Sequence, residues 1–152
     1  MARRPDQAVR VAVLHGPSLN LLGTREPQLY GTQTLADIER NLADVGKELG
    51  VTLSFAQHNG EGALIDAIQA LRGVADGAII NAGAYSHTSL AIRDAFLAVT
   101  VPFVEVHLSN VFAREPERRV SMLAPAAMGV VCGFGVASYE VGLRGLVARL
   151  RA

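Results

Sequence analysis

Short, almost unbroken apolar runs, separated by longer amphipathic stretches, constrain the fold of this chain more than any other feature. The runs cover Val9–Leu14, Val51–Ala56, Gly77–Asn81, Pro102–Val106 and Gly129–Gly133. Runs of this kind are typical of strands that helices cover on both faces of a parallel sheet. Their alternation with helical stretches therefore predicts a series of βαβ units.

The stretches between the runs have helical periodicity. Apolar side chains step by three and four residues through Leu35, Ile38, Leu42, Val45 and Leu49. Thr34 is suited to cap the start of this helix, and Gly50 to end it. The same pattern predicts helices over Ala63–Leu71, Ser89–Val99 and Tyr139–Leu150. Together these elements predict a flavodoxin-like three-layer α/β sandwich with a five-stranded parallel sheet.

Length and composition limit the class of protein. The chain has 152 residues, 50% of them hydrophobic, which fits a single domain over residues 1–152, with residues 1–8 as a flexible N-terminal tail. The single cysteine cannot form an internal disulfide, and the N-terminus lacks the apolar stretch of a signal peptide, so we expect a cytoplasmic protein. No run is long enough to span a membrane. Fourteen basic and fourteen acidic side chains argue against nucleic acid and for a small-molecule partner.

Two connections, residues 15–33 and 108–128, are much longer than the roughly 4–6 residues of a median connection, and loops of this length are usually functional or disordered. The first has glycines on either side of Arg25 and Tyr30. We interpret residues 16–33 as a lid over an active site.

Polar side chains follow the predicted strands at the edge where such sheets bind ligands. All four histidines fall at that edge: His15, His58, His87 and His107. Asn81 follows the third strand and begins a segment with an amide, a hydroxyl and an imidazole, which suits a ligand with several hydroxyl groups. Capping of the next helix by Ser86 would explain part of that segment without a function.

Glu105 and His107 are the strongest local pair. Residues two apart share a face of a strand, so the carboxylate can hold one ring nitrogen and direct the other at a ligand, as a general acid requires. A structural ion pair at the end of the strand would have the same spacing.

Arg25 and Tyr30 form the second pair. A tyrosine normally titrates near pH 10, so a tyrosine base needs a cation beside it that favours the phenolate. Solvated loop residues would fit the same positions. Arg114, Arg118 and Arg119 in the second long connection can meet an anion or form a solvated face.

No cofactor or metal is expected. The spacing of histidines, cysteine and carboxylates matches no metal site. Cys132 has no basic neighbour in sequence and is interpreted as a packing residue. The glycines at 133 and 135 follow the last strand, where a dinucleotide loop would lack its acidic ribose contact.

Three segments, residues 15–31, 81–94 and 105–110, resemble in order the sequence blocks of type II dehydroquinases, and the likeness spans nearly the whole chain. The resemblance implies a cofactor-free anti elimination of water from 3-dehydroquinate to 3-dehydroshikimate, in the shikimate route or in quinate breakdown. It implies that Tyr30 removes the proton beside the ketone, with Arg25 favouring the phenolate. His107, held by Glu105, would protonate the leaving hydroxyl.

The same resemblance implies a binding set and an assembly. Leu108 and Ser109 would bind the substrate carboxylate, Asn81, His87 and Arg118 the ring hydroxyls, and Asp94 would reach a neighbouring subunit's site. The expected assembly is a homo-oligomer, a dodecamer built as a tetramer of trimers.

Four positions depart from the family pattern. Ser18, beside the reacting atoms in the family, replaces an asparagine, and Glu117 stands where an aromatic residue is usual. His58 replaces a common serine, and Val120 a common histidine. Two alternatives therefore stay open. One is a catalytically weakened or non-catalytic oligomeric homologue that binds a polyol carboxylate, and the other is a flavodoxin-like nucleotide binder.

Overall fold

The protein is built around a five-stranded parallel sheet with strand order β2-β1-β3-β4-β5. The computed structural model describes residues 7–152, so residues 1–6 of the expected N-terminal tail lie outside the described residues. The strands are β1 (Val9–His15), β2 (Val51–Gln57), β3 (Gly77–Asn81), β4 (Phe103–His107) and β5 (Gly129–Cys132). They confirm the five predicted runs, with small shifts at the ends.

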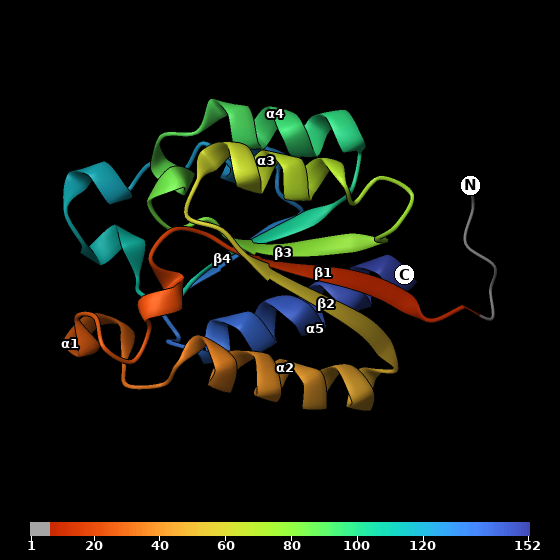
Figure 1. The fold of residues 1–152 in the computed structure, drawn as a ribbon, viewed down its shortest axis with the longest axis horizontal. Coiled ribbons are helices and arrows are strands. Elements are labelled where there is room, and N and C mark those ends of the chain that lie inside the picture. The colour runs from red at the N-terminus through yellow and green to blue at the C-terminus, as the bar shows by residue number, and fades with distance from the viewer. Residues whose placement is uncertain (1–6) are drawn as a thin grey trace.

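Helices form a layer on each face of the sheet (Figure 1). One layer contains α2 (Leu35–Leu49) and α5 (Ala137–Arg151), and the other contains α3 (Glu61–Gln69) and α4 (Leu90–Val99). The predicted flavodoxin-like three-layer sandwich is confirmed. The short helix α1 (Pro27–Tyr30) stands apart from both layers, at the end of the molecule away from the C-terminus. No helix in the described part of the chain is long and apolar enough to cross a bilayer.

Helix α2 forms where the periodicity predicts it because both of its ends are capped. Thr34 accepts a hydrogen bond from the backbone N–H of Asp37, and the Asp37 carboxylate accepts one from the backbone N–H of Thr34. Gly50 ends the helix in the left-handed region at a φ of 67°. The apolar face of α2 packs on the sheet, with Leu42 fully buried.

The prediction that helices cover every strand on both faces is wrong for the two edge strands. Thr52 and Ser54 of β2 and Val130 of β5 are exposed, whereas every residue of β3 and β4 is buried. An edge strand has a neighbour on one side only, so part of it extends past the helices into solvent.

The ends of β1 and β3 approach each other closely. The N–H of Gly16 donates to the carbonyl of Asn81 at 2.7 Å. A Cβ added at position 16 would lie 2.5 Å from the carbonyl carbon of Ala82, which is backbone and cannot move aside cheaply. Glycine is therefore required at position 16, and it places the loop after β1 directly against the loop after β3.

Candidate active site

A cavity of about 650 Å³, including the space at its open mouth, lies at the carboxyl edge of the sheet. The connections after β1, β3 and β4 line it, through Pro17, Ser18, Leu19, Arg25, Tyr30, Asn81, Gly83, Ala84, His87, His107, Leu108, Ser109, Val111, Arg114 and Arg118. The size suits a small molecule. Arg25, Arg114 and Arg118 are cationic, and none of the described side chains that line the cavity is acidic. The cavity therefore favours an anionic ligand.

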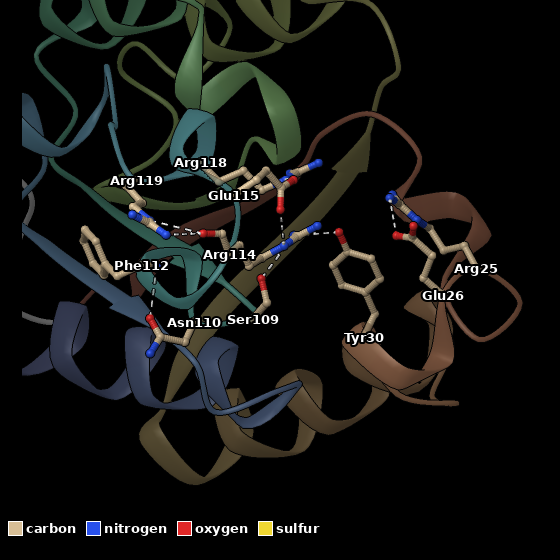
Figure 2. Close-up of polar contacts among 10 residues, drawn as sticks. All are labelled: Arg25, Glu26, Tyr30, Ser109, Asn110, Phe112, Arg114, Glu115, Arg118 and Arg119. Carbon is tan, nitrogen blue, oxygen red and sulfur yellow. Dashed lines mark hydrogen bonds and ion pairs between the residues drawn. The ribbon is translucent and has the colours of Figure 1, made fainter.

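Tyr30 lies between two guanidinium groups. Arg114 Nη1 donates to the Tyr30 hydroxyl at 2.9 Å and to Ser109 Oγ at 3.3 Å, as Figure 2 shows. The Arg25 guanidinium lies over the Tyr30 ring, 4.6 Å from its centroid, and forms an ion pair with Glu26 at 3.6 Å. The predicted Arg25–Tyr30 proximity is thus confirmed. The cation that contacts the hydroxyl itself, however, is Arg114.

From the sequence, Arg114 was expected to meet an anion or to belong to a solvated face, and not to contact Tyr30. Its bond to Tyr30 joins residues 84 positions apart. No local spacing could have indicated that contact.

His107 and Glu105 lie at the end of β4, where both are buried. The Glu105 carboxylate contacts His107 Nε2 at 2.9 Å, which assigns a proton to Nε2 and leaves Nδ1 as the ring nitrogen that can meet a ligand. Ser121 Oγ donates to the other oxygen of Glu105 and accepts from the N–H groups of Leu123 at 3.1 Å and Ala124 at 3.0 Å. The carboxylate is therefore held at both oxygens. Ser121, in the loop before β5, gave no signal in the sequence.

His87 stacks on His107, with ring centroids 5.8 Å apart and planes at 20°. Its Nδ1 donates to the carbonyl of Val120 at 2.8 Å. Burial lowers the pKa of His87, and the bond to Val120 partly opposes that shift. A neutral His87 with its proton on Nδ1 presents Nε2 as a hydrogen-bond acceptor.

Of the remaining predicted residues, Asn81, Leu108, Ser109 and Arg118 line the cavity, while Glu105 lies behind His107. Asp94 is exposed on α4 and does not line it. The predicted cap by Ser86 is wrong. Ser89 accepts from the N–H of Ile92 at 3.0 Å and caps α4, because it is the residue directly before the first helical turn.

Glu117 and Arg118 are neighbours on the 3-10 turn Pro116–Arg118, but the ion pair of Arg118 Nε is with Glu115, and Glu117 is exposed.

Ser18 lines the cavity in a strained conformation. Its φ is 67°, in the left-handed region that asparagine tolerates better than serine. Its N–H donates to Asn59 Oδ1 at 3.0 Å, which holds the loop after β1 against the loop after β2.

We expect Ser18→Asn to raise both stability and any activity of this cavity. Asparagine relieves part of the roughly 1–2 kcal/mol strain of a left-handed residue, and its amide reaches further into the cavity than a hydroxyl. A rise in Tm of a few degrees, with a severalfold higher kcat/KM, is the expected outcome of thermal unfolding and steady-state assays. A lower Tm would contradict the proposed strain.

His15 differs from the other predicted histidines because it faces the core and not the cavity. It is fully buried, and its Nδ1 lies 2.8 Å from the Tyr139 hydroxyl. Burial lowers the pKa of His15 to about 4, so the folded protein holds it neutral near pH 7.

We expect the folded state to lose stability on acidification because of His15. Between about pH 6.5 and 4 the unfolded chain binds a proton at His15 and the folded chain does not. The free energy of unfolding therefore decreases as the pH is lowered through that window. At about 1.4 kcal/mol per pKa unit, the loss is on the order of 3 kcal/mol. Denaturant unfolding at pH 7 and pH 4 measures it, and His15→Asn should show a correspondingly smaller loss. Equal losses in the two proteins would contradict the assignment.

A flavodoxin-like sheet with a cationic, histidine-lined cavity at its carboxyl edge defines an α/β protein whose cavity favours a small anionic ligand. Residues 9–147 match the family Dehydroquinase class II. The chain therefore belongs to the class II dehydroquinase family.

Relatives and solved structures agree with this assignment. The chain is 64% identical over 140 residues to a 3-dehydroquinate dehydratase of Gemmatimonas aurantiaca, covering 92% of each chain. It is 53% identical over 139 residues to the 3-dehydroquinate dehydratase of Prochlorococcus marinus, covering 91% of this chain and 96% of the relative. The crystal structure of a type II dehydroquinase from Butyrivibrio crossotus superimposes with a TM-score of 0.89 at 35% identity, over 95% of this chain and 99% of that one.

Proposed function

We propose that this protein is a type II 3-dehydroquinate dehydratase, a hydro-lyase that eliminates water from 3-dehydroquinate to give 3-dehydroshikimate. Family membership and the names of its relatives support the reaction. The observation that carries the mechanism is that Tyr30 and His107 line one cavity. Each has a partner suited to its role: a cation at the Tyr30 hydroxyl and a carboxylate behind His107.

Tyr30 is the base in the first step. Its phenolate takes the proton from the carbon beside the ketone, and the electron pair of the broken C–H bond becomes the enolate. Arg114 at the hydroxyl and Arg25 over the ring favour the phenolate by placing positive charge beside it. Ser18 lies on the wall of the same cavity and is a candidate donor to the enolate oxygen.

His107 is the acid in the second step. The enolate collapses, the carbon–carbon double bond forms, and the bond to the hydroxyl breaks as protonated His107 supplies a proton and water leaves. Glu105 holds Nε2 and stabilises the imidazolium that exists before this transfer. Tyr30 ends the cycle protonated and His107 neutral, so a proton returns from one to the other through solvent.

The remaining cavity residues bind the substrate in this proposal. The substrate carboxylate meets Ser109 and the backbone at Leu108, while Asn81, His87 and Arg118 contact ring hydroxyls. Asp94 is exposed on α4, so it can act only at the cavity of a neighbouring subunit, as in the proposed dodecamer.

Residues 16–33 carry both Arg25 and Tyr30, and we propose that they close over the bound substrate as a lid. The cytoplasm is the proposed location.

One assay tests the proposed function directly. Purified protein is mixed with 3-dehydroquinate, and formation of the conjugated enone is followed by ultraviolet absorbance. Turnover is expected. No signal from protein shown to be folded by circular dichroism would remove the enzymatic proposal.

The strained Ser18 in place of asparagine favours one second candidate, a weakened homologue that binds a polyol carboxylate. Calorimetric binding of 3-dehydroquinate without turnover would favour it. Recovery of turnover in Ser18→Asn would then attribute the weakness to this single position.

A further inference from the structure

The loop after β1 reaches the cavity at Ser18 and is held there from two sides. The N–H of Ser18 donates to Asn59 Oδ1, in the loop after β2, at 3.0 Å. Two residues earlier, the carbonyl of Gly16 accepts from Gln57 Nε2 at 3.1 Å, while its N–H donates to the carbonyl of Asn81 at 2.7 Å. The start of this loop is therefore fixed between the ends of β2 and β3.

Gln57, the last residue of β2, also orients the Asn59 side chain. Its Nε2 donates to Asn59 Oδ1 at 3.0 Å, so that oxygen accepts one hydrogen bond from Gln57 and one from Ser18. Both lone pairs of the oxygen are then used. Since the NH₂ group of an amide accepts no hydrogen bond, these two donors determine which end of the Asn59 amide faces Ser18.

The support from Asn59 matters because Ser18 has a φ of 67°, in the left-handed region. Asparagine and aspartate adopt this region more readily than serine, since their side chains can form hydrogen bonds with the nearby backbone. The Ser18 hydroxyl does not cap the 3-10 turn Leu19–Leu21 that follows it. Ser18 therefore depends on Asn59 for its conformation, and its hydroxyl stays available to a ligand in the cavity.

We propose that Asn59, oriented by Gln57, is a positioning residue for the first step of the dehydratase reaction. It keeps Ser18 in the conformation from which the Ser18 hydroxyl donates to the enolate oxygen. The inference rests on the proposed function, in which Ser18 is the candidate donor. Asn59 and Gln57 do not line the cavity, so they act through the loop that they hold.

The test is a double-mutant cycle between Asn59→Ala and Ser18→Gly, with kcat and KM measured separately. Ser18→Gly removes the hydroxyl but tolerates the left-handed backbone, and it should lower kcat about a hundredfold, as loss of one oxyanion donor does. Asn59→Ala leaves the hydroxyl in place but releases it, so kcat should fall about tenfold while KM changes by less than about twofold. In the Ser18→Gly protein, Asn59→Ala should change kcat by less than about twofold, because no hydroxyl is left to position.

A second arm of the test uses Ser18→Asn. Asparagine needs less outside support in the left-handed region, so Asn59→Ala should lower kcat in this protein by no more than about threefold. A role of Asn59 in packing alone would give the same loss whatever the residue at position 18. The cycle therefore separates positioning of the Ser18 hydroxyl from general support of the loop.

His58→Ala is the matched control. His58 precedes Asn59 in the same loop, and its side chain does not line the cavity. The hydrogen bonds from this loop and from the end of β2 to residues 16–20 come from Asn59 and Gln57, and the backbone N–H of His58, which donates to His15, is kept. The kcat of His58→Ala should stay within about twofold of the unaltered value.

The outcomes distinguish this inference from the proposed function. No turnover by the unaltered protein would overturn both. An active protein in which folded Asn59→Ala keeps its kcat, or loses as much in the Ser18→Gly protein as in the unaltered one, would overturn the inference alone. Asn59 is exposed, so its substitution leaves the core intact. Should Asn59→Ala still not fold, Gln57→Leu takes its place in the cycle, and the same two results would overturn the inference.

Discussion

Replacing Tyr30 with phenylalanine is expected to lower kcat about a thousandfold, in the middle of the range for loss of a positioned general base. The substitution removes only the hydroxyl, so KM should change by no more than a few-fold. The reason is that this hydroxyl receives a hydrogen bond from Arg114 at 2.9 Å and faces the cavity that Arg25 and His107 also line. Ultraviolet assays over a range of 3-dehydroquinate concentrations measure both constants.

Tyr85→Phe is the matched control for this prediction. The Tyr85 hydroxyl donates to the carbonyl of Asn59 at 2.9 Å and does not line the cavity, so kcat should stay within a few-fold of the unaltered value. Arg114→Met and Arg25→Met then rank the two cations. Arg114→Met should cause the larger loss of kcat, because Arg114 contacts the hydroxyl whereas Arg25 lies over the ring. A Tyr30→Phe protein with near-normal kcat would assign the base to another group.

The fold could be predicted from sequence because its signals are local. The periodicity of α2 and its caps at Thr34 and Gly50 lie within one stretch of chain, and α2 formed with those bounds. Strand burial was less predictable. Whether β2 is central or at an edge depends on strand order, which no single run of residues encodes.

In the site, too, contacts between residues close in sequence could be predicted, and contacts between distant residues could not. Glu105 and His107 are two residues apart on one strand, so their contact followed from the strand period alone. The bond from Arg114 to Tyr30 and the Tyr139 contact with His15 join residues 84 and 124 positions apart. Those contacts arise only when the loops and α5 pack on the sheet. His15 shows the same limit, since its position at the carboxyl edge was predicted but its turn into the core was not.

Replacing His107 with glutamine is expected to lower the rate of water loss by about a thousandfold, since a general acid contributes a factor similar to that of a general base. The step that it blocks differs from the one that Tyr30→Phe blocks. With Tyr30 intact, the enolate still forms and is reprotonated by the same residue. In deuterated water, His107→Gln should therefore return substrate that carries deuterium beside the ketone, detected by mass spectrometry. Tyr30→Phe should lose exchange and elimination together, each by about the thousandfold factor expected for its kcat.

Substitutions of Glu105 and Ser121, which lie behind His107, should also lower the rate of elimination, by smaller factors. Glu105→Gln keeps the shape but removes the negative charge at Nε2, so elimination should fall about tenfold to a hundredfold while exchange continues. Ser121→Ala removes one hydrogen-bond partner of the Glu105 carboxylate and should lower the rate of elimination a few-fold. The order His107, Glu105, Ser121 follows the distance of each group from the proton that is transferred. Loss of exchange together with elimination in Glu105→Gln would mean that the carboxylate supports enolate formation, and the two-step division of roles between β4 and the lid would have to be abandoned.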